Sequence, residues 1–221
     1  MRNLTRSPHL KVLATIVGAI ILAIFLRVFV IHAYRIPSAS MENTLLIGDF
    51  LLAERLTFGS TLEFPWSHRT DFRLPMLSQP KRGEIVIFLG WERNGMEYIK
   101  RCVGLPGDTI EVVDNRLFVN GTPSDCVVES AETRVSTDVR RIPSHHTDHL
   151  HNFGPHVVGY DSIFVMGDNR GNSEDSRIQG DVPMSALRGR PMIVYWSVDR
   201  TISWWNPLKR IRWNRIGRRI R

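Results

Sequence analysis

Cysteine is scarce in this chain, since only Cys102 and Cys126 occur among its 221 residues. Two thiols allow at most one disulfide, which excludes the small folds that disulfides build. The two cysteines either pair or stay reduced, with Cys102 as a small buried residue, and we favour the second alternative. Repeats and low-complexity segments are also missing. A hydrophobic content of 43% with 23% charged residues excludes global disorder.

Acidic residues are absent from the last fifteen positions, 207–221, which contain seven lysines and arginines and which we call the basic tail. The whole chain has 29 basic and 22 acidic residues, so its net charge of +7 resides in this tail and the remainder is neutral. A neutral body argues against a nucleic-acid partner. The basic tail is either a solvated extension or a membrane-surface contact with Trp213, Ile216 and Ile220 on one helical face, and we favour the contact.

A second long apolar run is missing, so the chain is expected to cross a membrane once. The single run, 12–31, is 20 residues long, or about 30 Å as a helix, which is enough to span a bilayer. Arg27 lies near its distal end and is expected to snorkel to the interface. No Ala-x-Ala cleavage site follows, so we predict an uncleaved anchor within residues 1–33. Basic residues precede the run, which places the N-terminus in the cytoplasm and the rest of the chain outside.

Long amphipathic helices are absent between the anchor and the basic tail. Short runs rich in β-branched and aromatic residues alternate with turn signals there, which predicts a mainly β fold with antiparallel sheets in a sandwich or partial barrel. We expect a β-rich catalytic core over 34–121 and 157–206, with 122–156 as an insert or small subdomain. The predicted strands are 50–53, 84–89, 98–103, 109–113, 116–119, 162–166 and 191–198.

The predicted insert is polar and contains five of the eight histidines, at positions 145, 146, 149, 151 and 156. Imidazole is a common zinc ligand, but these histidines are irregularly spaced and no cysteine lies among them. We therefore favour a solvated loop over a metal site and expect no metal.

The chain has no Gly-x-Ser-x-Gly motif, but it has two serines close together after the apolar run. Ser38 and Ser40 lie two positions apart, so in an extended segment they face the same side. Pro37 stiffens the approach to them. Such serines usually stabilise turns. A catalytic role requires a base nearby, and no histidine stands in a recognisable arrangement with them.

Lysine is the alternative base, and Lys100 lies inside the predicted strand 98–103. Alternation places Tyr98, Lys100 and Cys102 on one face of that strand. A lysine that works as a base near pH 7 needs its pKa lowered from about 10.4 to about 7, which corresponds to between 4 and 5 kcal/mol of differential solvation. Burial of this face would supply the shift, whereas an ordinary strand lysine is solvated and charged.

Four blocks, in this order, complete the pattern: Ile36-Pro37-Ser38-Ala39-Ser40-Met41 with Gly48-Asp49; Arg82-Gly83-Glu84-Ile85-Val86-Ile87-Phe88; Tyr98-Ile99-Lys100-Arg101-Cys102-Val103 with Pro106-Gly107-Asp108; and Met166-Gly167-Asp168-Asn169-Arg170 with Asn172-Ser173 and Asp175-Ser176-Arg177. Together with the apolar run, they resemble the bacterial type I signal peptidases. The chain departs from that pattern at Asn43, where a proline is usual, at Gly171, where an acid is usual, and at Ile178-Gln179.

The resemblance implies a Ser/Lys endopeptidase that works without a cofactor. Ser40 would be the nucleophile and Lys100 the general base. The backbone N–H of Ser40 and the Ser38 hydroxyl would form the oxyanion hole. Ser173 would orient Lys100. Asp175 and Arg177 would brace the strand and loop around them.

The resemblance also implies the substrate and the location. The enzyme would remove N-terminal signal peptides from exported preproteins, cutting after Ala-x-Ala at the outer face of the bacterial cytoplasmic membrane, as a single-pass monomer. Its partners would be signal peptides and the lipid bilayer. The residues implied in two shallow substrate pockets are Tyr34, Ile36, Met41, Leu45, Ile87, Tyr98 and Ile99.

Two other functions compete with this one. A membrane-anchored scaffold whose basic tail recruits nucleic acid or lipid would not need the four ordered blocks. A self-cleaving regulator shares the Ser/Lys pair, but would normally be cytosolic and carry a DNA-binding module. Cleavage of an Ala-x-Ala signal peptide in trans separates these alternatives.

Overall fold

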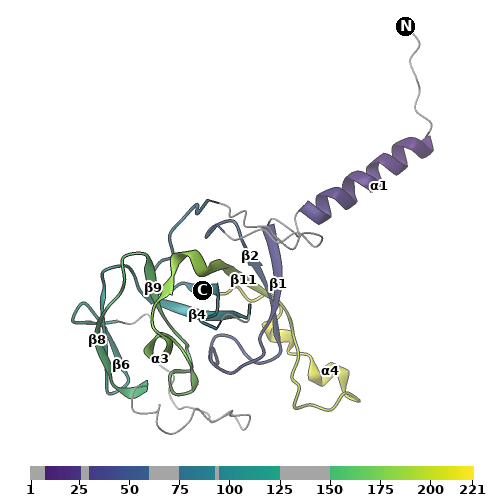
Figure 1. Cartoon of the computed structure of the whole chain (residues 1–221). Helices are drawn as coiled ribbons and strands as arrows, with labels where there is room; N and C mark the ends of the chain where they lie inside the picture. The colour runs from purple at the N-terminus through teal and green to yellow at the C-terminus, as the bar shows by residue number, and fades with distance from the viewer. Residues whose placement is uncertain (1–7, 26–29, 60–74, 93–94, 125–149) are drawn as a thin grey trace.

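The computed structural model describes residues 8–25, 30–59, 75–92, 95–124 and 150–221. Two antiparallel sheets form its body, and helix α1 lies apart from them (Figure 1). The strands are β1 (Ile31–Arg35), β2 (Asp49–Glu54), β3 (Ile85–Leu89), β4 (Glu97–Gly104), β5 (Thr109–Val113), β6 (Arg116–Val119), β7 (Thr122–Pro123), β8 (Phe153–Val157), β9 (Ser162–Met166), β10 (Val182–Pro183) and β11 (Leu187–Ser197). The helices are α1 (Pro8–Phe25), η3 (Arg170–Asn172), α3 (Ser176–Gln179), η4 (Met184–Ala186), α4 (Pro207–Arg210) and η5 (Trp213–Arg215).

The mainly β class with antiparallel sheets is confirmed. The larger sheet has seven strands in the order β1-β2-β11-β3-β4-β9-β10, and the smaller has four in the order β7-β6-β5-β8. All seven predicted strands are present. The hairpin between β5 and β6 turns at Asp114 and Asn115, which both have positive φ (48° and 65°). This is the backbone that a two-residue turn requires, and these residue types tolerate it.

Strand β4 is where the core clusters of the body meet. Its Cys102 belongs to one buried cluster, its Val103 to a second, and its Ile99 packs against a third. The residues of β4 from Lys100 onward are all buried. A side chain in the middle of this strand is therefore surrounded by protein, which decides the environment of Lys100.

The apolar run 12–31 is not helical at its predicted end. Helix α1 covers Pro8–Phe25 among the described residues, and Ile31 begins β1, which pairs with β2 from Ile31 opposite Glu54 to Arg35 opposite Phe50. An apolar run does not by itself distinguish helix from strand, and here the hydrogen bonds to β2 decide. Arg27 lies outside the described residues. Within the described parts of the chain, no helix is both long and apolar enough to cross a membrane.

The predicted insert 122–156 is too wide at both ends. Strand β7 pairs with β6, and β8 pairs with β5, so both ends of the segment belong to the smaller sheet. Strand β8 was missed because Gly154 and Pro155 both have low strand propensity. Pairing with β5 outweighs that propensity. Residues 125–149 lie outside the described structure.

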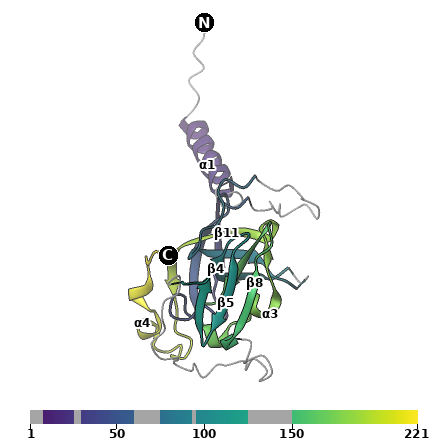
Figure 2. The ribbon, with the colours of Figure 1, turned by 90° about the vertical axis from the view of Figure 1, so that its left-hand side faces the viewer.

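The basic tail is not the single helix that the shared face of Trp213, Ile216 and Ile220 requires, and that prediction is wrong. Only α4 and the short η5 are helical, and the last residues run extended beside β11 (Figure 2). Ile220 donates its N–H to Met192 O at 2.9 Å. Backbone bonds to an existing strand thus replace the helical bonds that so short a segment would hold weakly.

Candidate active site

Ser38 and Ser40 lie in a loop, 36–49, whose two ends are joined. Ile36 donates its N–H to Asp49 O at 2.9 Å, and Gly48 donates to Ile36 O at 3.1 Å. The Ser38 and Ser40 hydroxyl oxygens are 3.4 Å apart, so the two serines do face the same side. We call residues 36–49 the serine loop.

The turn after Ser40 is anchored in the core. Leu45 donates its N–H to Met41 O at 2.8 Å, and both side chains are buried. Asn43 in this turn has φ 89°, a conformation closed to proline, whose ring holds φ near −65°. Asn43 thus adopts a backbone conformation that a proline at this position could not. Met41 and Leu45, on either side of it, both belong to a buried core cluster.

Lys100 is almost completely buried, with 2% of its surface exposed. Its backbone pairs with Val86 of β3. Burial lowers the pKa of Lys100 from 10.5 to about 8, because the ammonium loses its water. The carboxylate of Asp175 acts in the opposite direction and Arg177 in the same direction as burial. The lysine is thus held close to the pKa that a general base needs at neutral pH.

The segment that follows β9 contacts the serine loop through Asn169. Asn169 donates its N–H to Ser40 O at 3.1 Å and its side-chain amide to Ala39 O at 3.1 Å. A Cβ at Gly167 would lie 2.2 Å from Ser173 Oγ and 2.4 Å from Ser40 O, so only glycine fits there. Ser40 and Ser173 therefore converge over Gly167.

Ser173 is fully buried, and its hydroxyl has no hydrogen-bond partner among the described residues. A buried hydroxyl without a partner costs about 1–3 kcal/mol and calls for an explanation. An amine or a bound substrate that accepts this proton would satisfy the hydroxyl.

Asp175 and Arg177 form a fully buried, two-point ion pair. The Arg177 Nε and Nη2 atoms each lie 2.9 Å from an Asp175 carboxylate oxygen. Burial alone would raise the pKa of Asp175, but the Arg177 guanidinium lowers it overall. Asp175 also accepts the N–H of Gly167 at 3.0 Å, so the pair braces the segment that holds Ser173.

A second buried ion pair holds the serine loop and was not predicted as part of the site. Arg101 Nη2 lies 2.6 Å from Asp168 Oδ2, and Thr44 donates its hydroxyl to the same oxygen at 2.6 Å. The signal was present, because Arg101 and Asp168 belong to the matched blocks and Arg101 follows Lys100 directly. The alternation of side chains along the predicted strand did not indicate a role in the site for either residue.

The seven residues implied in substrate pockets do not all offer surface. Ile36, Met41, Leu45 and Ile87 are core residues with at most 4% exposure. Tyr34, Tyr98 and Ile99 are half-buried. Tyr34 and Ile99 pack against the cluster that contains Ile36, Met41 and Leu45, whereas Tyr98 packs against the cluster of Cys102.

Residues 9–196 match the family model described as signal peptidase, peptidase S26. The chain belongs to this family.

Two relatives that are named as signal peptidase I enzymes match most of the chain. A probable signal peptidase I-2 from Synechocystis is 36% identical over 84% of this chain and 72% of its own length. A signal peptidase I from Leptolyngbya laminosa is 31% identical over 88% of this chain and 83% of its own length. A crystal structure of a signal peptidase I from Enterococcus faecalis, 32% identical, covers 51% of this chain and 97% of its own, with a TM-score of 0.40. As a member of the signal peptidase family, with these two relatives, the protein is a serine peptidase and a hydrolase.

The other candidate sites fall partly outside the described structure. Cys126 and three of the five histidines lie there, so the cysteine prediction stays a prediction. Cys102 is buried, and its thiol lies 3.6 Å from Gly104 O. His151 contacts Asn115 at 2.6 Å and His156 contacts Asp181 at 2.8 Å. The part of the chain that is described has no group of three or more histidines, cysteines or carboxylates that could hold a metal.

Proposed function

We propose that this signal peptidase family member removes signal peptides from exported preproteins, with Ser40 as nucleophile and Lys100 as general base. The observation that carries the proposal is the burial of Lys100, which lowers its pKa to about 8 in a strand beside the loop of Ser173. An exposed lysine would be neutral in too few molecules at neutral pH to serve as a base.

The proposed chemistry uses side chains and backbone groups of this chain and one water molecule. Neutral Lys100 takes the proton of Ser40 as Oγ attacks the scissile carbonyl carbon. The Ser38 hydroxyl and the Ser40 N–H donate to the oxyanion that forms. The C–N bond then breaks, and Lys100 returns the proton to the leaving amine. Lys100 next deprotonates a water that attacks the acyl carbon; the ester bond to Ser40 breaks, and Lys100 returns this proton to Ser40 Oγ. The buried Ser173 hydroxyl is free to orient the lysine during both steps.

The accessible surface favours small substrate side chains. We propose that the substrate binds as an added strand, with main-chain hydrogen bonds for affinity and shallow pockets for specificity. Only Tyr34, Tyr98 and Ile99 of the implied pocket residues are partly accessible, and the others are filled core positions. A deep pocket for a large side chain would require the core to open. This supports a preference for Ala-x-Ala.

We further propose a monomer anchored once in the bacterial cytoplasmic membrane, with the β-rich body on the outer side. The large apolar side chains along α1 are exposed, for example Ile21 at 62%, as expected of residues that face lipid. The exposed aromatic pair Trp204 and Trp205, stacked at 3.6 Å, and the exposed Trp213 would add a second contact at the membrane surface.

The test is cleavage of a preprotein with an Ala-x-Ala site by the full chain in detergent micelles. Ser40→Ala is expected to abolish cleavage, and Lys100→Met to lower kcat by at least about 100-fold. The matched controls are Ser78→Ala and Lys81→Met, at exposed positions. Full cleavage by either Ser40→Ala or Lys100→Met would refute the dyad, and equal cleavage of a substrate with leucine directly before the cut would refute the small pockets.

A further inference from the structure

We propose that Arg215, assisted by Arg212, is a positioning residue for the nucleophile, so that part of the basic tail completes the active site. The inference rests on the proposed role of Ser40. It concerns residues beyond position 196, where the match to the family model ends. It also assigns Arg212 and Arg215, two of the seven basic side chains of the tail, to contacts inside the protein and not to a membrane surface.

The guanidinium of Arg215 is held inside the protein against the serine loop. Its Nη2 lies 2.6 Å from Asp49 Oδ2 and donates to Thr44 O at 2.9 Å, and its Nε lies 3.0 Å from Asp49 Oδ1. The Arg215 side chain is 8% exposed and the Asp49 side chain is 0% exposed. Arg212 donates to Ile47 O at 3.0 Å from the same side. Two carbonyl groups and one carboxylate of the serine loop are thus fixed by the basic tail.

Asp49 is the point where the serine loop closes. Its carboxylate accepts the N–H of Leu46 at 2.9 Å and the hydroxyl of Ser197 at 2.7 Å, and its carbonyl accepts the N–H of Ile36. A fully buried carboxylate requires a cation, because its desolvation is otherwise uncompensated. Arg215 supplies that cation, and its fork geometry bridges the carboxylate and the Thr44 carbonyl in a way that a lysine does not match.

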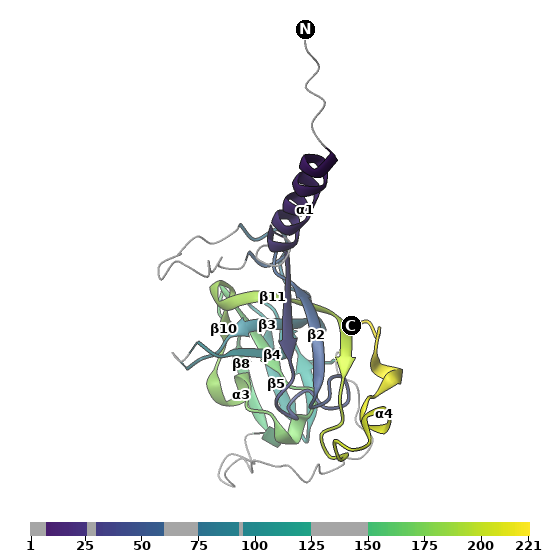
Figure 3. The same ribbon diagram turned by 90° about the vertical axis from the view of Figure 1, so that its right-hand side faces the viewer.

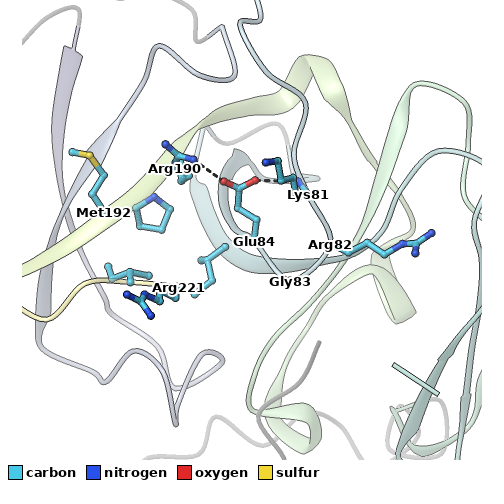
Figure 4. A pocket seen from close by; sticks show the side chains of 10 residues that line it. Lys81, Arg82, Gly83, Glu84, Arg190, Met192 and Arg221 are labelled. Atoms are coloured by element: carbon cyan, nitrogen blue, oxygen red, sulfur yellow. Dashed lines mark hydrogen bonds and ion pairs between the residues drawn. The ribbon is translucent and has the colours of Figure 1, made fainter. Parts of the chain in front are cut away.

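The basic tail is itself held firmly enough to act as a support. Val194 of β11 donates its N–H to Arg218 O at 3.0 Å and accepts the N–H of Gly217 at 2.8 Å. The terminal residues line a cavity of about 460 Å³ between β11 and the segment before β3 (Figure 4). An ion pair between Arg190 and Glu84 crosses this cavity at 3.1 Å, and none of the predicted catalytic or substrate-binding residues line it. The cavity thus marks where the end of the tail is seated, and Figure 3 shows the C-terminus close to the end of β11.

The serine loop is therefore fixed by two different parts of the chain. Asp168 and Asn169 hold the Thr44 hydroxyl and the Ser40 carbonyl. Arg215 and Arg212 hold the Thr44 and Ile47 carbonyls and the Asp49 carboxylate of the same loop. An error of about 1 Å in the position of a reacting atom costs about 100-fold in rate, so the contacts that fix the loop of the nucleophile bear on kcat.

The experiment compares Arg215→Gln and Arg215→Lys in the full chain, with a preprotein substrate in detergent micelles. Relative to the wild type, kcat per folded molecule is expected to fall about 100-fold for Arg215→Gln and about tenfold for Arg215→Lys. KM should stay within about twofold, and the pH midpoint of kcat should not move, since Lys100 is untouched. Arg218→Gln makes the same charge change at an exposed tail position and should leave kcat at the wild-type value.

The folded fraction is measured for each variant by urea unfolding. If Arg215→Gln does not fold, Arg215→Lys decides the question, because it keeps a cation beside Asp49. The inference is overturned if the folded variants keep kcat within twofold of the wild type, or if KM rises while kcat is unchanged. Wild type and Ser40→Ala run in the same assay: a wild type that does not cut, or a Ser40→Ala that does, would refute the proposed function instead.

Discussion

Replacing Lys100 by methionine should lower kcat by at least about 100-fold and yet stabilise the protein at neutral pH. The side chain of methionine is unbranched and apolar and fills irregular core space well. Lys100 is buried, and its pKa is lowered from 10.5 to about 8. The unfolded chain returns the lysine to its ordinary value. The folded state thus binds fewer protons than the unfolded state between about pH 8 and pH 10.5.

The sign of the effect follows from this difference in proton binding. Stability rises with pH wherever the unfolded state holds more protons, so the wild type gains stability as the pH rises through this window. At pH 7 the lowered pKa corresponds to a penalty of about 3 kcal/mol, and at pH 10.5 to less than about 1 kcal/mol. Lys100→Met removes the ionisable group, so its advantage in unfolding free energy over the wild type should shrink from about 3 kcal/mol to less than about 1 kcal/mol over that range.

The assay has two arms on the same protein in detergent micelles. Urea unfolding followed by tryptophan fluorescence at pH 7, 8.5 and 10.5 gives the stability difference, with Lys81→Met as control, which should change stability by less than about 0.5 kcal/mol. The pH dependence of kcat/KM for the wild type should show an acid limb with its midpoint near 8. A midpoint near 10, or a stability difference between the wild type and Lys100→Met that does not change with pH, would refute a lowered pKa of Lys100.

Three further predictions test the surroundings of Ser40 and Lys100. Gly167→Ala should lower kcat about 100-fold, because its Cβ would lie 2.4 Å from Ser40 O, whereas Gly171→Ala, with open space around its Cβ, should leave kcat unchanged; equal kinetics for the two would contradict this. Asp175→Asn should lower the unfolding free energy by about 3–5 kcal/mol, since it leaves a buried guanidinium without its anion, and a loss under 1 kcal/mol in urea unfolding would argue against the bracing role. Replacing both Trp204 and Trp205 by serine in a chain that begins at residue 30 should weaken sedimentation with anionic vesicles at least tenfold, with Tyr160→Ser, at an even more exposed aromatic residue, as control; unchanged binding would exclude that surface.

Local pattern was sufficient for most of the strands. The runs that became β5, β6 and β9 have the residue types and turn signals of strands at both ends, so pattern and packing agree. Strand β1 was missed because it continues an apolar run that suits a helix equally well. Strand β8 was missed because glycine and proline disfavour a strand until a partner is present. In both cases the deciding hydrogen bonds come from residues far away in the chain.

The amino-acid sequence by itself determined the chemistry that is available, namely two neighbouring serines and a lysine on the alternating face of an apolar strand. The relation of Lys100 to its surroundings was decided only by the tertiary structure, because burial depends on three core clusters that meet at β4. The proposed role of Arg215 likewise depends on the tertiary structure and not on the sequence alone. A basic tail is solvated by default, and only the fold brings one of its arginines to a buried carboxylate 166 positions earlier in the chain.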